Sequence, residues 1–435
     1  MLSKLEKKTS IISILLLSLG TFFGAGLAFI TQIILARTLG SESFGLFTST
    51  LAIITLISPL AVFGIPQLWL KVFGEEGWNA RRWVTPSFFV TLGSTALVII
   101  LLLTWALLFN NNYQTQVLIF ILSIYILGQV SLELVSSKYQ LEENYVRLAQ
   151  LQLIPHLMRF ILVVFFIIFF KEFISAKYIA IIYSIVSIFF TLYAMIQINK
   201  IMKGEFLLKG HKEESIQVYK SVKIKKIIKN SWPFSLATFF YLIYFQSDLI
   251  LVKYFVGNHA AGIYNVAFTI IVAIFLFPSI IYQKFLLSKI HRWANHDKNK
   301  LYQVYKKGNI LMLTSGIIIL MLVLSTSSYI IPLLFGTEYN EAVKILNILA
   351  ISIPIIFLAH SSGSMLVTKN HMKLKVKYMG TVALINITLN IFVIPIYGAI
   401  GASITTNISN VLLLFLYYYG TRKYIFNDGE RSNEY

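Results

Sequence analysis

LARTLGSESFGLF at residues 35–47 and LVKYFVGNHAAGIY at residues 251–264 are two versions of one junction between long apolar runs. Both read aliphatic pair, base, a spacer, glycine, four residues, glycine, aliphatic residue and aromatic residue, and the spacer has two residues in the first copy and three in the second. Internal repetition in a polytopic membrane protein is the usual architecture of a transporter. The repeat therefore predicts two similar halves with the functional site at their interface.

The composition indicates a membrane protein. Hydrophobic residues make up 57% of the chain, charged residues make up 13%, and the mean hydropathy is +0.75. A helix needs about 20 apolar residues to cross the hydrocarbon core, in which every backbone amide must be bonded internally. The sequence predicts an all-α polytopic membrane protein with about twelve transmembrane helices. Their expected ranges are 11–35, 46–69, 84–109, 115–135, 148–170, 177–198, 232–255, 262–283, 309–333, 343–366, 376–395 and 399–419.

These spans predict two pseudo-symmetric lobes around a central cavity, each with half of the helices. The expected boundaries are an N-terminal lobe at 1–198, a basic cytoplasmic linker at 199–230, a C-terminal lobe at 231–420 and a cytoplasmic tail at 421–435. Placing both termini in the cytoplasm leaves five bases in outer loops and one, Arg159, inside a predicted span. The other Lys and Arg residues are then cytoplasmic, as the positive-inside rule requires.

The formal net charge of +19 follows from this orientation. It predicts attraction to anionic membrane lipids as partners, and it does not indicate nucleic-acid binding. The chain has no cysteine, which excludes disulfides, thiol catalysis and thiolate metal sites. We expect no metal, no cofactor and no catalytic residues.

Arg159 is the most costly side chain of the first half. Gln152, His156 and Arg159 follow one another at i, i+4 and i+7, so they share a helical face, and Pro155 kinks the helix beside them. A charge at that depth needs a polar partner. We expect this face to line an anion-binding cavity, and the alternative is that Arg159 pairs with Glu133 of the preceding helix.

Asp248 is the second costly group, in the outer part of the seventh predicted helix. A desolvated carboxylate can exchange protons, so Asp248 and Glu133 are candidates for ion coupling. The alternative for Asp248 is a structural role near the outer water interface.

The second half carries polar faces at Asn386 and Asn390, and at His360 with its neighbouring serines. Such side chains bind substrate or join helices. If they line a cavity, the first half supplies charge and the second half supplies hydroxyls and amides. This asymmetry suits a ligand with an anionic end and a hydroxylated body.

Four segments together resemble the Wzx-type polysaccharide flippases, which export O-antigen and capsule repeat units. The segments are 36–45, 247–264, 334–346 and 386–402. The resemblance implies membership of the wider superfamily of multidrug extruders and lipid-precursor flippases. It also implies alternating-access transfer of undecaprenyl-pyrophosphate-linked oligosaccharides to the outer leaflet of the bacterial plasma membrane, for surface polysaccharide or lipopolysaccharide biosynthesis. In such a protein the pyrophosphate is bound by cavity bases, a role that Arg159 and the rim base Lys71 would fill, and the polymerase machinery is a further partner.

Two other classes of protein compete with this interpretation. A multidrug extruder, or a flippase for another lipid-linked precursor, would have the same fold. A membrane polysaccharide polymerase or ligase would need catalytic groups, and the sequence shows no carboxylate pair, metal cluster or nucleophile constellation. We therefore expect a transporter and not an enzyme.

Overall fold

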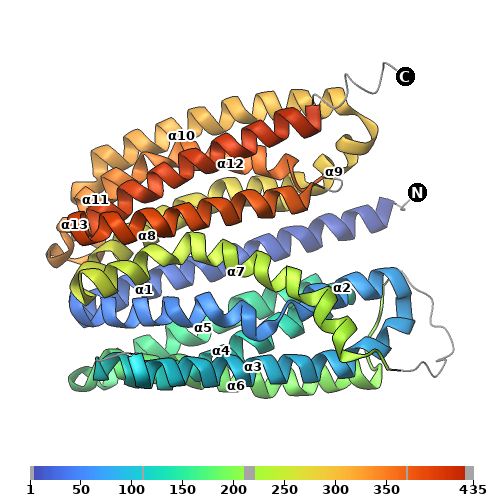
Figure 1. Cartoon of the computed structure of the whole chain (residues 1–435), viewed down its shortest axis with the longest axis horizontal. Coiled ribbons are helices and arrows are strands. Elements are labelled where there is room, and N and C mark those ends of the chain that lie inside the picture. The colour runs from blue at the N-terminus through green and yellow to red at the C-terminus, as the bar shows by residue number, and fades with distance from the viewer. Residues whose placement is uncertain (1–3, 110–111, 210–220, 369–370, 427–435) are drawn as a thin grey trace. The chain divides into compact units, whose positions relative to one another are not determined.

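The computed structural model describes residues 4–109, 112–209, 221–368 and 371–426 (Figure 1). Within these ranges every regular element is a helix and no strand occurs. The predicted all-α fold class is confirmed. The middle of the expected linker, residues 210–220, and the end of the expected tail, residues 427–435, lie outside the described residues.

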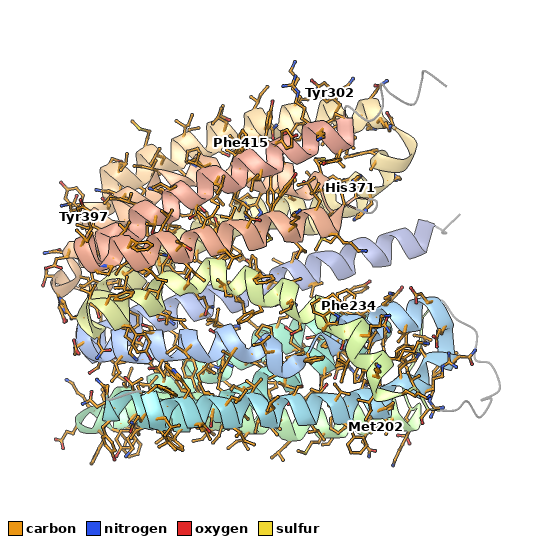
Figure 2. The ribbon with its side chains drawn as sticks, viewed as in Figure 1. Met202, Phe234, Tyr302, His371, Tyr397 and Phe415 are labelled. Carbon is orange, nitrogen blue, oxygen red and sulfur yellow. The ribbon has the colours of Figure 1, made fainter. Side chains whose placement is uncertain are left out.

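In the described ranges, nine helical runs are long and apolar enough to cross a membrane. The first of them, Leu17–Phe109, contains several of the expected spans, and the last, Met372–Phe426, contains two. Apolar side chains on these runs face outward, as Phe415 and Tyr397 do, with 62% and 63% of their surface exposed (Figure 2). Such exposure is typical of lipid-facing surface. The count of twelve spans, the cytoplasmic termini and the central cavity stay predictions.

The chain divides into two compact units. Unit 1 comprises Met1–Thr31 and Thr50–Leu242, and unit 2 comprises Gln32–Ser49 and Ile243–Tyr435. The stretch Gln32–Ser49, which contains the non-helical kink at Gly40 between two helices, thus packs with the second half of the chain. The lobe boundaries expected from the sequence stay a prediction.

Unit 1 is built around one central helix. Its elements are most of α1 (Lys4–Val62), α2 (Ile65–Glu76), a 3-10 turn (Gly77–Ala80), α3 (Arg81–Phe109), α4 (Tyr113–Leu141), α5 (Tyr145–Phe169), a 3-10 turn (Lys171–Phe173), α6 (Ala176–Lys203) and the first part of α7 (Ile224–Phe255). Helix α4 contacts α2, α3, α5 and α6. It begins at the N-cap Asn112, whose side chain accepts a hydrogen bond from the Thr115 amide at 3.0 Å.

The expected helix 46–69 is divided in the structure. Phe63 and Gly64 have positive φ angles of 55° and 67°, which end α1, and α2 starts anew at Ile65 with Pro66 in its first turn. A left-handed residue cannot continue a right-handed helix, whereas proline suits a first turn. The expected span is therefore two helices, α1 up to Val62 and α2 from Ile65.

The glycine pair of α1 is a packing site. A Cβ atom added at Gly20 would lie 2.9 Å from the Ala149 Cβ, and one added at Gly24 would lie 3.1 Å from the Gln152 carbonyl oxygen. These contacts bring α1 close to α5, as small residues at spacing four allow in membrane helices.

Unit 2 contains the rest of α1 and α7, then α8 (Asn258–Ser279), a π-helix (Ile280–Leu286), α9 (Leu287–His296), α10 (Lys298–Phe335), a 3-10 turn (Thr337–Tyr339), α11 (Glu341–Ala350), α12 (Ser352–Met365), α13 (Met372–Thr421) and a π-helix (Arg422–Phe426). Helix α12 contacts α8, α10 and α13. The expected helix 343–366 is divided at Ile351. The expected helices 376–395 and 399–419 lie on the two sides of Gly398, whose non-helical φ of 59° separates two helices within α13.

The two copies of the repeated junction pack against each other inside unit 2. Gly40 and Gly257 occupy equivalent places in the repeat, and both have positive φ angles, 72° and 124°. A Cβ added at Gly45 would lie 1.8 Å from the Asn258 carbonyl oxygen, and one added at Gly262 would lie 2.2 Å from the Ser41 carbonyl oxygen. Each copy thus presents its second glycine to the other, as in a contact with two-fold symmetry.

Polar contacts fix the first copy of the junction in place. The Glu338 carboxylate accepts hydrogen bonds from the Ser41 amide at 2.8 Å and from the Ser41 hydroxyl, which also lies 2.6 Å from His259 Nδ1. Arg37 donates to the Leu334 carbonyl oxygen at 2.7 Å. The hydrogen bonds from Ser41 hold the pKa of Glu338 below its ordinary value, because they stabilise the ionised carboxylate.

Candidate functional site

Unit 1 contains a cavity of about 290 Å³. Its walls come from the end of α1, from α2, from α4 and from the first part of α7, at the place where the break after Val62 interrupts the helix. The only carboxylate in the lining is Glu133, and the lining contains two amides, Gln67 and Gln129, and no base. Among the described residues the ion pairs are Arg82–Glu76 and Lys138–Glu142, so Glu133 has no counter-charge there.

Three hydroxyl groups of this cavity donate their protons to backbone carbonyl oxygens. Ser58 donates to the Ile54 carbonyl oxygen at 2.8 Å, Ser235 to the Pro59 carbonyl oxygen at 2.9 Å, and Thr238 to the Phe234 carbonyl oxygen at 3.2 Å. A hydroxyl whose proton is donated elsewhere offers only its lone pairs to a ligand. Ser58, Ser235 and Thr238 therefore act as hydrogen-bond acceptors toward the cavity.

Arg159 lies elsewhere in unit 1. It is 6% exposed, and its guanidinium carbon lies 4.9 Å from the ring centroid of Tyr125 on α4 and 5.1 Å from that of Tyr183 on α6. Its Nε atom has no hydrogen-bond partner in the part of the chain that the structure describes. The structure does not show the alternative ion pair with Glu133, because two aromatic faces occupy the place of a carboxylate. The predicted role of Arg159 as an anion ligand stays a prediction.

The other two members of the predicted stripe face α1. Gln152 accepts a hydrogen bond from the Thr21 hydroxyl at 2.5 Å. The His156 ring lies 3.3 Å from the position of a Cβ added at Gly24. The structure thus gives Gln152 and His156 one neighbourhood and Arg159 another, although the three follow a helical repeat.

Lys71 is exposed on α2 and follows Gln67 of the cavity lining by four residues. Residues at this spacing are neighbours on a helix surface. The base predicted at the rim therefore lies one helical turn from the cavity.

Asp248 is the centre of a buried polar network in unit 2. It is 2% exposed and accepts hydrogen bonds from the Tyr264 hydroxyl at 3.0 Å, from the Thr406 hydroxyl and from the Asn390 amide. Asn390 also donates to the Asn386 side-chain oxygen at 3.0 Å. Asp248, a candidate for ion coupling, and Asn386 and Asn390, candidates for substrate binding, therefore form one cluster.

A small cavity of about 20 Å³ adjoins Asp248 and Thr406. A space of this size holds one water molecule or one small ion. The Asp248 carboxylate and the Thr406 hydroxyl oxygen border this space, and hard cations prefer such oxygen ligands. The arrangement can bind a proton or a single cation, whereas no group of three His, Cys, Asp or Glu side chains occurs among the described residues.

His360 is half-buried on α12, and Lys375 lies close enough for its charge to act on it. Lys375 was not among the predicted site residues, because the eleventh helix was expected to start at residue 376, whereas α13 begins at Met372. The Lys375 ammonium lies 5.8 Å from the ring centroid of Tyr417. The second half therefore does carry a base within a membrane helix.

Tyr264 and Thr406, which bind Asp248, and the two rings around Arg159 were also missed. Tyr264 ends the second copy of the repeated junction, so its recurrence in the motif was a signal available in the sequence. Tyr125, Tyr183 and Thr406 carry no such signal.

A profile of the family described as polysaccharide biosynthesis protein matches residues 11–286. The capsular polysaccharide biosynthesis protein CapF of Staphylococcus aureus is 25% identical over 170 residues, which are 39% of this chain and 43% of that relative. The match thus spans less than half of the length of this curated relative.

Two solved structures are similar over nearly the whole chain. One is "Lipid II flippase MurJ, inward closed conformation", with a TM-score of 0.70, 16% identity, and coverage of 94% of this chain and 87% of that chain. The other is an inward-facing multidrug resistance MATE family transporter of the MOP superfamily, with a TM-score of 0.70, 13% identity, and coverage of 96% and 99%. At these identities the likeness shows a shared fold.

Proposed function

We propose that this chain, which belongs to the polysaccharide biosynthesis protein family, carries lipid-linked saccharides across the bacterial membrane that it spans several times. The resemblance to the Wzx-type polysaccharide flippases is confirmed by the family match. The proposed cargo is an undecaprenyl-pyrophosphate-linked oligosaccharide repeat unit, moved from the inner to the outer leaflet by alternating access, for surface polysaccharide biosynthesis.

The observation that carries this proposal is the cavity between membrane-spanning helices of unit 1, in whose largely apolar lining several polar side chains gather. A saccharide cannot cross hydrocarbon without hydrogen-bond partners for its hydroxyls. Gln67, Gln129 and Glu133 supply such partners in a space large enough for a sugar ring. Polar groups at this position are costly, so a cavity that collects them is a functional site by default.

We assign the anionic end of the cargo to Lys71. Its ammonium is exposed one helical turn from the cavity, whereas Arg159 is enclosed by two aromatic rings. In this proposal Arg159 holds α4, α5 and α6 together. The stability and transport of Arg159→Ala and Arg159→Lys distinguish this structural role from direct binding of pyrophosphate. Roles for Gln152, His156 and His360 in binding the cargo remain part of the proposal.

The Asp248 network is the proposed ion-coupling site. A buried carboxylate with a one-ion cavity beside it can take up and release a proton or a monovalent cation. Asn386 and Asn390 then orient this carboxylate, in place of the substrate-binding role expected from the sequence. For Glu133, which the sequence suggested for ion coupling, we propose cargo binding instead. Contacts with anionic lipids and with polymerase machinery are proposals that rest on charge and on the resemblance.

Drug export is the second candidate function. The Glu133 cavity has an acid and no base, which suits organic cations, and a multidrug transporter shares the fold. A polymerase or ligase is less consistent with the family match, and we propose no catalytic step.

The test is transfer of a fluorescent undecaprenyl-pyrophosphate oligosaccharide between the leaflets of proteoliposomes, followed with a membrane-impermeant quencher. We expect the intact protein to accelerate transfer, Lys71→Ala to slow it and Lys71→Arg to restore part of the rate. Lys344→Ala is the matched control, because Lys344 is exposed on α11 and lines neither cavity. Equal transfer by protein-containing and protein-free vesicles would refute the proposal.

A further inference from the structure

We propose that the cavity around Glu133 recognises a protonated amino sugar, so that the preferred cargo carries a free amine. This inference rests on the proposed function, and it names a feature of the saccharide that the family match leaves open. Three properties of the cavity carry it: its charge, its hydrogen-bonding pattern and its size.

The charge of the cavity is unbalanced. Glu133 lies on a membrane-spanning helix, and no Lys, Arg or His is part of the lining. A carboxylate at such a position requires a proton, a cation or a hydrogen-bonded partner. The nearest base of α2, Lys71, lies one turn beyond Gln67 and stays outside the lining. A cationic group of the cargo would supply the missing charge.

The hydrogen-bonding pattern points to the same ligand. The hydroxyl protons of Ser58, Ser235 and Thr238 are donated to backbone carbonyl oxygens, so these groups act as acceptors toward the cavity. An ammonium group offers three donors and no acceptor, and sugar hydroxyls offer further donors. A phosphate, which offers only acceptors, would meet the lone pairs of these hydroxyls and the charge of Glu133. Although the amides of Gln67 and Gln129 can donate to an anion, Glu133 and these hydroxyls favour the sugar end of the cargo over its anionic end.

The size of the cavity excludes a bare ion as the best fit. Its volume is about 290 Å³. At roughly 15 Å³ for each water-sized position, this space holds about twenty non-hydrogen atoms. A hexosamine ring with its substituents has about a dozen, and a single hydrated cation needs far less. The two amides, Gln67 and Gln129, add donors for the ring oxygen and acceptors for the hydroxyls.

The prediction separates two cargoes that differ in one group. A free amine is protonated and can pair with Glu133, whereas an N-acetylated amine is neutral and bulkier. Because a hydrogen bond to a charged group is stronger than one to a neutral group, we expect at least about a tenfold preference for the amine.

The experiment uses two undecaprenyl-pyrophosphate disaccharides that are identical except for a free or an acetylated amine on the terminal hexosamine. Transfer is measured in proteoliposomes at limiting lipid concentration for the intact protein, Glu133→Gln and Glu172→Gln. Glu172 is exposed in the 3-10 turn after α5 and is the matched control. We expect the intact protein and Glu172→Gln to prefer the amine, and Glu133→Gln to move both lipids at the rate of the acetylated one.

A second measurement does not depend on transport. Binding of glucosamine and of N-acetylglucosamine to the purified intact protein is compared by saturation-transfer NMR. Preferential binding of glucosamine supports the inference even if neither lipid moves, a result that would refute the proposed function alone. Equal transfer of the two lipids by the intact protein, equal binding of the two sugars, or a preference that survives Glu133→Gln in a folded protein would overturn the inference.

Discussion

Replacing Gly45 by alanine tests the packing of the two junction copies. The added Cβ atom would lie 1.8 Å from the Asn258 carbonyl oxygen, and 2.5 Å from the Gly262 amide nitrogen. Real Cβ contacts are essentially never shorter than 3.0 Å, so the backbone would have to move by about 1.2 Å, which is 3.0 minus 1.8. Both obstructing atoms belong to backbone, and neither can rotate away as a side chain would.

The magnitude follows from two opposing terms. Alanine is favoured over glycine inside a helix by about 1 kcal/mol. Forcing an extra carbon into a packed contact costs about 1 to 3 kcal/mol, and the backbone contact at Gly45 lies at the upper end. We therefore expect Gly45→Ala to lower the free energy of unfolding by about 2 kcal/mol. Gly93→Ala is the matched control, because nothing lies within 4 Å of a Cβ added at Gly93. There the helix propensity acts alone, and the substitution stabilises by about 1 kcal/mol or is neutral.

The assay is denaturant unfolding of the protein in detergent micelles, with the intrinsic fluorescence of its six tryptophans as the signal. The midpoints of Gly45→Ala and Gly93→Ala are compared at equal slope, since a change in slope would indicate a different unfolding reaction. If Gly45→Ala unfolds at the same denaturant concentration as Gly93→Ala, the reciprocal contact does not exist and the reasoning is refuted.

Three further substitutions test the polar groups. Asp248→Asn places an amide donor where the carboxylate accepts three hydrogen bonds, so we expect the free energy of unfolding to fall by about 1 to 3 kcal/mol in the same assay. We also expect transport to lose any dependence on proton or cation gradients. An unchanged dependence would exclude Asp248 as the coupling site. Arg159→Ala removes two cation–π contacts, each worth about 2 kcal/mol when desolvated, so it should destabilise the protein more than Arg159→Lys does. If Arg159→Ala is as stable as the intact protein but no longer transports, Arg159 is instead a cargo ligand. Because folding lowers the pKa of Glu338, the contribution of its carboxylate to stability is complete above the ordinary pKa of 4.5 and is lost as the pH falls through the lowered pKa. The stability of the intact protein should therefore fall more steeply in acid than that of Glu338→Gln. Parallel stability curves between neutral and acidic pH would contradict this.

The fold class could be predicted because it follows from composition and from run length. The places where the runs break were only partly predictable. Gly40 and Gly257 are marked by the repeated junction, and the break at Gly398 lies between two expected helices. The break at Phe63 and Gly64, inside the expected helix 46–69, was not predicted. A glycine with positive φ cannot be distinguished in the sequence from one that only allows close packing.

The candidate site could be predicted residue by residue but not as a set. Asp248 and Arg159 were identifiable because a charge inside a membrane span is costly wherever it occurs. Their partners lie on other helices: Asn390 follows Asp248 by 142 positions, and the partners of Arg159 are aromatic rings. Helical periodicity relates residues of one helix only. It could therefore not pair Asp248 with Asn390, and it could not show that the neighbour of Arg159 is Tyr125 and not Glu133. The cavity of unit 1 has walls from four helices and was invisible for the same reason.

The most direct test of the central claim compares two cargoes for the intact protein in the same proteoliposomes. One is a fluorescent undecaprenyl-pyrophosphate oligosaccharide, and the other is a fluorescent organic cation of the kind that multidrug transporters export. The proposed function predicts that the lipid-linked saccharide changes leaflet faster than in protein-free vesicles and that the cation does not accumulate. Accumulation of the cation with no transfer of the lipid would contradict the account and would identify drug export as the function.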